Sequence, residues 1–138
     1  MRLPDRRLIV FCFAWGMKGL ISLAFLLLIS CVSIERSTAR RLTGEWLYAD
    51  KTQSCRYIFK RDGTFNGEVL VQAKLISKFT GRWSIEGHTL SYRYETDLLG
   101  RIPPAALDHD NLLVVRQDSF TIEAADGSQR EYRRIRER

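Results

Sequence analysis

Few residues in this sequence have types and spacings that could do chemistry. Asp108-His109-Asp110 sets an imidazole between two carboxylates, and these groups bind several divalent metal ions. A metal site needs further ligands from elsewhere, and His88 is the only other histidine. No serine lies in a nucleophile-elbow motif with a recognisable base. The residues therefore predict no metal, no cofactor and no enzymatic active site.

The cysteines divide between two parts of the chain. Cys12 and Cys31 lie in an apolar N-terminal segment, and Cys55 lies in the remainder. Cys55 alternates in step with Tyr57 and Phe59, which predicts a buried position on a strand. A reactive thiol needs access and a lowered pKa, so we expect Cys55 to be part of the core instead.

The N-terminal segment has the order of a secretory signal peptide. Two apolar stretches, Leu8–Trp15 and Leu20–Val32, are each shorter than the ~20 residues that a spanning helix needs. Lys18 supplies a positive charge ahead of an apolar run over Leu20–Leu28, and the small Ser30 follows. Residues 1–30 are therefore predicted to form a signal helix, and Met17 could be the true start.

Leu28-Ile29-Ser30-Cys31 resembles the lipobox of bacterial lipoproteins. This resemblance implies cleavage before Cys31, which would carry a diacylglycerol and an N-acyl chain that hold the protein to a membrane. Val32, in place of an aspartate after the cysteine, implies the outer membrane with the protein facing the periplasm. Two alternatives remain, an uncleaved anchor over 8–32 and cleavage with release. The uncleaved anchor would place Lys18 near the middle of a spanning helix, at a cost of roughly 2.5–3.5 kcal/mol.

The formal net charge is +6, with 22 Lys and Arg against 16 Asp and Glu. Such a charge suggests nucleic-acid binding, but the predicted export from the cytosol argues against it and no basic helical motif supports it. Residues 31–43 are polar without periodicity and predict a short tether. Its arginines, Arg40 and Arg41, predict a solvated face with attraction to anionic lipid headgroups.

From Gly44 onward the apolar residues repeat with period 2, the signal of β-strands. Turn signals at Asp62-Gly63, Glu86-Gly87 and Asp126-Gly127 separate successive strands. The pattern predicts an all-β domain over 44–136, an antiparallel up-and-down meander of eight strands. Closing the meander into a small barrel removes its exposed edges, so a barrel is expected first and an open sandwich second.

Gly44-Glu45-Trp46 in the first strand resembles the G-x-W element of lipocalins and small lipocalin-like domains. The runs 59–65 and 81–87 (FKRDGTF and GRWSIEG) are similar to segments of such domains in envelope proteins. The resemblance implies that an arginine on the last strand covers Trp46 and closes one end of the barrel. Arg134 matches best by strand parity, with Arg133 as the alternative. It also implies binding of a small apolar ligand or of another envelope component, without enzymatic activity.

Two features leave the mode of binding open. All eleven aromatic residues after residue 34 fall at inward positions, enough to fill a small barrel largely: Trp46, Tyr48, Tyr57, Phe59, Phe65, Phe79, Trp83, Tyr92, Tyr94, Phe120 and Tyr132. The loop Thr96–Asn111 carries Leu98, Leu99, Ile102 and Leu107. It would either cap the barrel with these side chains or serve as a lid or contact surface. The alternative to an internal ligand is therefore a structural or inhibitory interaction module with a filled core.

Overall fold

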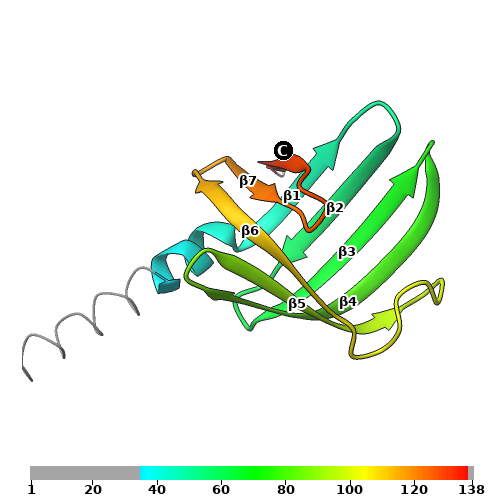
Figure 1. The fold of residues 1–138 in the computed structure, drawn as a ribbon, viewed down its shortest axis with the longest axis horizontal. Helices are drawn as coiled ribbons and strands as arrows, with labels where there is room; N and C mark the ends of the chain where they lie inside the picture. The colour runs from blue at the N-terminus through cyan, green and yellow to red at the C-terminus, as the bar shows by residue number, and fades with distance from the viewer. Residues whose placement is uncertain (1–34, 137–138) are drawn as a thin grey trace, which may run out of the picture. The chain divides into compact units, whose positions relative to one another are not determined.

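The structure is a computed structural model that describes residues 35–136, where eight strands form a closed antiparallel barrel (Figure 1). The strands run in chain order around the barrel, and β8 returns to pair with β1. They are β1 (Gly44–Ala49), β2 (Gln53–Phe59), β3 (Thr64–Val71), β4 (Lys74–Glu86), β5 (Thr89–Asp97), β6 (Leu107–Val115), β7 (Ser119–Glu123) and β8 (Gln129–Arg134). The predicted eight-stranded barrel is confirmed in place of an open sandwich. The predicted signal peptide and Cys31 lie outside the described residues.

Because successive strands run in opposite directions, their connections alternate between two ends of the barrel. One end carries the β2–β3, β4–β5 and β6–β7 turns together with residues 35–43, which lead into β1. We call it the helix end. The other carries the β1–β2, β3–β4, β5–β6 and β7–β8 connections, and we call it the loop end.

Part of the tether predicted over 31–43 is helical, over residues 35–42. Its last residue, Leu42, is completely buried, and the Leu42 carbonyl accepts a hydrogen bond of 2.7 Å from the Trp46 indole N–H. The sequence has no helical period here because a single apolar side chain attaches this helix to the barrel. Packing thus stabilises a helix that local propensity does not specify. In the part of the chain that the structure describes, no helix is of the length and apolarity needed to cross a membrane.

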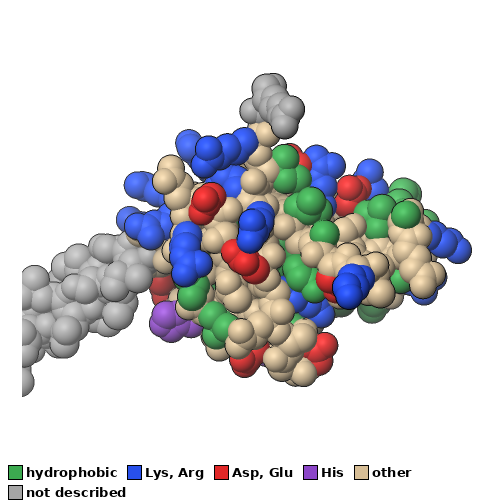
Figure 2. All heavy atoms as spheres, turned by 90° about the horizontal axis from the view of Figure 1, so that it is seen from above, with side chains coloured by type: hydrophobic (Ala, Val, Ile, Leu, Met, Phe, Trp, Pro, Cys, Tyr) green, Lys and Arg blue, Asp and Glu red, His purple; other side chains and the backbone are tan. Residues whose placement is uncertain are grey.

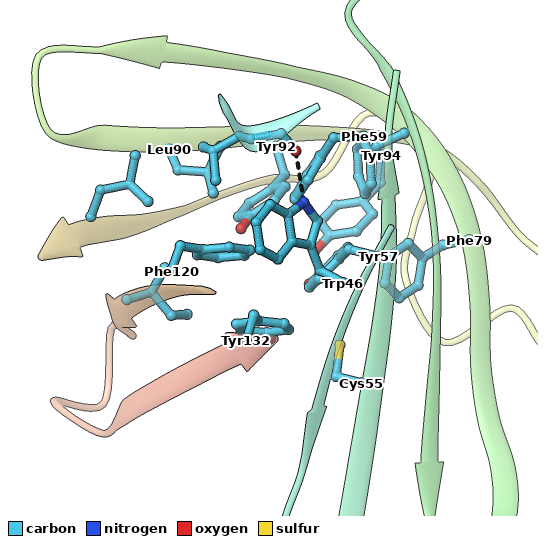
Figure 3. Packing of buried hydrophobic residues seen from close by; sticks show 14 residues of the cluster. Trp46, Cys55, Tyr57, Phe59, Phe79, Leu90, Tyr92, Tyr94, Phe120 and Tyr132 are labelled. Carbon is cyan, nitrogen blue, oxygen red and sulfur yellow. Dashed lines mark hydrogen bonds between the residues drawn. The ribbon is translucent and has the colours of Figure 1, made fainter. Parts of the chain in front are cut away.

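Aromatic rings from several strands pack against one another inside the barrel (Figure 3). Tyr57 of β2 stacks on Tyr92 of β5 with ring centroids 5.7 Å apart, although two strands separate β2 from β5. Tyr57 also lies 5.6 Å from Tyr132 and 5.9 Å from Phe79. Nine of the eleven predicted inward aromatics are buried, and Tyr48 and Trp83 pack partly buried against them. Rings from several sides of the barrel therefore meet near its axis.

The predicted loop Thr96–Asn111 is shorter in the structure, where β5 continues to Asp97 and β6 begins at Leu107. Polar residues such as Asp108 and Asn111 are poor strand formers, which hides the start of β6 in the sequence. Their backbones nevertheless pair with β5, with Asp108 opposite Tyr92 and Asn111 opposite Thr89. The connecting loop therefore covers only residues 98–106.

Candidate binding site at the loop end

At the helix end, the structure brings together the three residues that the resemblance assigned to barrel closure. Trp46 and Arg134 are direct partners in the β1–β8 register. The Arg134 guanidinium lies 4.1 Å from the centroid of the Trp46 ring, a distance suited to a cation–π interaction. Gly44 adopts φ +132°, and a Cβ atom there would overlap the Arg134 guanidinium. Glycine at position 44 therefore leaves the space that the arginine occupies.

Arg134 also fastens the helix to the barrel. Its guanidinium donates to the carbonyls of Arg41 (2.6 Å), Thr43 (2.9 Å) and Gln117 (2.8 Å). The carbonyls at the C-terminus of a helix have no partners within the helix, and a basic side chain can satisfy them. One side chain therefore joins the helix, β1 and the β6–β7 turn.

We expect Arg134→Ala to lower the free energy of unfolding by about 2–4 kcal/mol, because it removes three charge-assisted hydrogen bonds and the contact with Trp46. Arg134→Lys keeps the charge, but a single ammonium lacks the planar fork that reaches several carbonyls. The lysine variant should recover less than half of the loss in urea unfolding. An alanine variant as stable as the unsubstituted protein would contradict this role.

At the loop end, polar side chains stand above the aromatic core. Asp110 on β6 is half-buried and accepts a hydrogen bond of 2.9 Å from the Tyr92 hydroxyl. Asp108 shares the inward face of β6 with Asp110, because it lies opposite the inward Tyr92. Arg130 of β8 lies 6.0 Å from the Tyr48 ring centroid and 3.9 Å from Asp126. We call Tyr48, Tyr92, Asp108, Asp110 and Arg130 the polar mouth.

The thiol and phenol groups in and below the mouth stay protonated near neutral pH. Burial raises the pKa of the Cys55 thiol, and burial raises the pKa of Tyr57 and Tyr92 well above that of a free phenol. Burial also raises the pKa of Asp110, with a contribution from Asp108, although the bond from Tyr92 opposes the shift. A protonated thiol and protonated phenols are poor nucleophiles, so this cluster is suited to hydrogen bonding.

Asp97 shapes the 98–106 loop above the mouth. Its carboxylate accepts backbone N–H bonds from Arg101 (2.6 Å), Ile102 (3.0 Å) and Lys78 (3.1 Å). Burial raises the pKa of Asp97, but these backbone bonds outweigh burial and hold it below the ordinary carboxyl value. A charged side chain at the end of β5 therefore orders the loop.

The apolar side chains predicted to lie in this loop divide into two groups. Ile102 packs against the core and covers part of the barrel end. Leu98 and Leu107 are 75% and 78% exposed, and Leu99 is 47% exposed. The loop therefore packs against the core through Ile102 and its neighbour Ala106, and its leucines take no part in this packing. We call Leu98, Leu99 and Leu107 the apolar rim.

The structure separates the residues considered as metal ligands. His109 is exposed on the outer face of β6, Asp110 points inward, and His88 lies in the β4–β5 turn at the opposite end. No three His, Cys, Asp or Glu side chains within 35–136 come together as a metal site.

Sequence reasoning did not identify Arg130 and Asp110 as mouth residues. Side chains alternate between the two faces of a strand. Counting back from the inward Leu112 would therefore have placed Asp110 and Asp108 on the inward face of β6.

Comparisons with known proteins bear on the fold. The crystal structure of a lipocalin-like protein from Bacteroides uniformis matches with a TM-score of 0.53 and 20% sequence identity. The match covers 69% of this chain and 99% of that one. No family model matches this sequence, and no curated protein does. The domain therefore has a lipocalin-like fold, as the G-x-W element predicts.

Proposed function

We propose that this chain is a lipoprotein of the bacterial envelope, held by acyl chains on Cys31, that binds another envelope component at the loop end of its barrel. Its role is binding without catalysis, and it faces the periplasm from the outer membrane. The observation that supports binding at the outside of the barrel is that aromatic side chains occupy its interior. There the rings of Tyr57, Tyr92 and Tyr132 meet across the barrel.

A filled interior favours an external contact over an internal apolar ligand. Ligand cavities in proteins commonly measure about 300–1,000 Å³. Here Gly67 leaves room for the Phe79 ring, because a Cβ atom at position 67 would overlap that ring. The glycine and the ring fit together so that side chains occupy the space in which an apolar ligand would lie.

The loop end has the composition of a contact surface. The apolar rim places three leucines beside the charged and phenolic groups of the polar mouth. Protein interfaces combine an apolar centre with polar groups that fix orientation. These properties support binding of a partner protein in the envelope.

The anchor rests on the lipobox-like Leu28-Ile29-Ser30-Cys31. A single acyl chain gives only marginal and reversible membrane binding, whereas two or more chains hold a protein stably. The diacylglycerol and the N-acyl chain on Cys31 would therefore keep the barrel at the membrane surface.

Site-specific photo-crosslinking in living cells tests the binding surface. A photoreactive residue at position 107, in the apolar rim, is expected to give one discrete adduct with an envelope protein. The matched control is position 113, also an exposed leucine on β6 but outside the rim. We expect no discrete adduct from position 113, and loss of the 107 adduct when Leu98 and Leu99 become serine.

Two outcomes would contradict the proposed surface. One is the same set of adducts from positions 107 and 113, which would indicate non-specific contact along β6. The other is a small molecule that co-purifies with the protein and is lost from a variant altered only inside the barrel, such as Tyr57→Leu. That result would assign binding to the interior.

A further inference from the structure

The helix end of the barrel carries an excess of basic side chains. Its acidic residues outside the strands are Glu35, Asp62 and Asp118. Its basic residues outside the strands are all exposed, and they come from the helix, the β2–β3 turn, the β6–β7 turn and the residues after β8: Arg36, Arg40, Arg41, Lys60, Arg61, Arg116 and Arg136. Lys and Arg side chains gather on the left of Figure 2, the side where Figure 1 places this helix.

At the loop end, by contrast, the connections carry equal numbers of basic and acidic side chains. Its connections carry Lys51 and Arg101 against Asp50 and Asp126. The ion pairs between residues in the 35–136 range include none of the seven basic residues of the helix end. The barrel is therefore polarised, with its positive charge concentrated where the chain enters it.

A groove at the helix end combines this charge with apolar surface. It measures about 630 Å³ and lies between the helix, the β2–β3 turn and β4. Arg40 and Arg61 line it together with Trp83 and Ile85. Guanidinium groups bind phosphate through paired hydrogen bonds, and tryptophan is enriched at the level of lipid headgroups. The groove thus offers charge for a phosphate and apolar contact for the adjoining part of a lipid.

The length of chain before the barrel limits how far this end can lie from the acyl chains. The Glu35 carboxylate accepts a hydrogen bond from the Gly87 N–H, which fixes Glu35 at the helix end. Cys31 precedes Glu35 by four positions. Even a fully extended chain spans only about 14 Å over that interval. Electrostatic attraction in physiological salt acts over about 8 Å, and a tether this short allows the basic residues at this end to approach the surface within that distance.

We propose that the helix end docks on the anionic headgroups of the membrane that holds the acyl chains, with a lipid phosphate between Arg40 and Arg61. This inference rests on the proposed lipid anchor at Cys31. Docking orients the barrel, because the loop end then faces away from the lipid and presents the apolar rim and the polar mouth to partners. The acyl chains supply attachment, and the arginines supply orientation.

The test uses the full chain processed in a bacterial host, with its acyl chains verified by mass, in vesicles of phosphatidylcholine alone or with 30% phosphatidylglycerol. A nitroxide on a fraction of the headgroups quenches tryptophan fluorescence at close range. Trp83 lines the groove, whereas Trp46 is completely buried. We expect stronger quenching in the anionic vesicles, and loss of that difference in 1 M NaCl, where screening is nearly complete.

Two double variants with the same change in charge separate docking from general attraction. Arg40→Gln with Arg61→Gln should lower the ratio of docked to undocked protein by at least about tenfold, from the contribution of a basic residue near an anionic surface. Lys51→Gln with Lys74→Gln, at the loop end, should leave quenching unchanged. Melting temperatures confirm that both variants are folded.

Equal quenching in the two vesicle types, or equal loss in the two double variants, would overturn the docking while leaving the lipid anchor intact. Protein recovered from the host without acyl chains would overturn the proposed anchor and the docking with it.

Discussion

Replacement of Trp46 by alanine is expected to lower the free energy of unfolding by about 3–5 kcal/mol, a loss large enough to unfold a small domain. The indole is completely buried and meets Phe120 edge to face with centroids 4.9 Å apart. Its N–H donates to the Leu42 carbonyl, and Arg134 lies over its ring. Alanine removes all three contacts and leaves a cavity at the closed end. Urea unfolding followed by far-UV circular dichroism measures the loss.

Leu47→Ala is the matched control for Trp46→Ala. Leu47 is the next residue on β1, points outward and is 39% exposed. Its replacement should cost less than about 1 kcal/mol, since little buried surface is lost. Similar losses at both positions would mean that Trp46 does not hold the closed end. A substitution at position 46 that left the unfolding curve unchanged would contradict the barrel itself.

Replacement of Gly81 by alanine is expected to be comparably damaging, by about 3 kcal/mol or more. Gly81 is buried on β4 opposite Tyr94, next to an irregularity in the β4–β5 register. A Cβ atom there would overlap the backbone carbonyl oxygen of Arg93 and come within 2.8 Å of the Phe65 ring. The backbone of a central strand cannot yield without breaking sheet hydrogen bonds, so the whole strand pair must shift.

Gly87→Ala provides the comparison for Gly81→Ala. Gly87 has φ +58° in the β4–β5 turn, and an added Cβ atom would meet no atom within 4 Å. The cost there is limited to backbone strain of about 1 kcal/mol. Thermal unfolding should therefore rank the variants with Gly81→Ala well below Gly87→Ala. The reverse order would show that β4 and β5 do not pack as described.

The strand pattern could be predicted from the sequence because alternation and turn residues are local signals. Asp62-Gly63 and Asp126-Gly127 mark two of the turns, and the inward parity of Phe59 and Phe65 follows from their spacing. The contact of Arg134 with Trp46 came from the resemblance to lipocalins. Local pattern alone does not pair residues so far apart in the chain.

Other features depend on tertiary contacts that no local pattern reveals. The helix over 35–42 is held by Leu42 and by bonds from Arg134. The start of β6 is polar, and only its pairing with β5 makes it a strand. The loop was expected either to cap the barrel with its leucines or to form a lid or contact surface, and the structure shows it ordered by Asp97 with Leu98 exposed. The polar mouth could be assembled only once the barrel had closed.

Native mass spectrometry of protein purified from the membranes of its host tests the lipid-anchored barrel most directly. We expect a chain that begins at Cys31, carries diacylglycerol and N-acyl mass, and holds no small molecule in its interior. The Cys31→Ala variant should carry no lipid and should keep residues 1–30. Wild-type protein that is unmodified and still contains residues 1–30 would contradict the account.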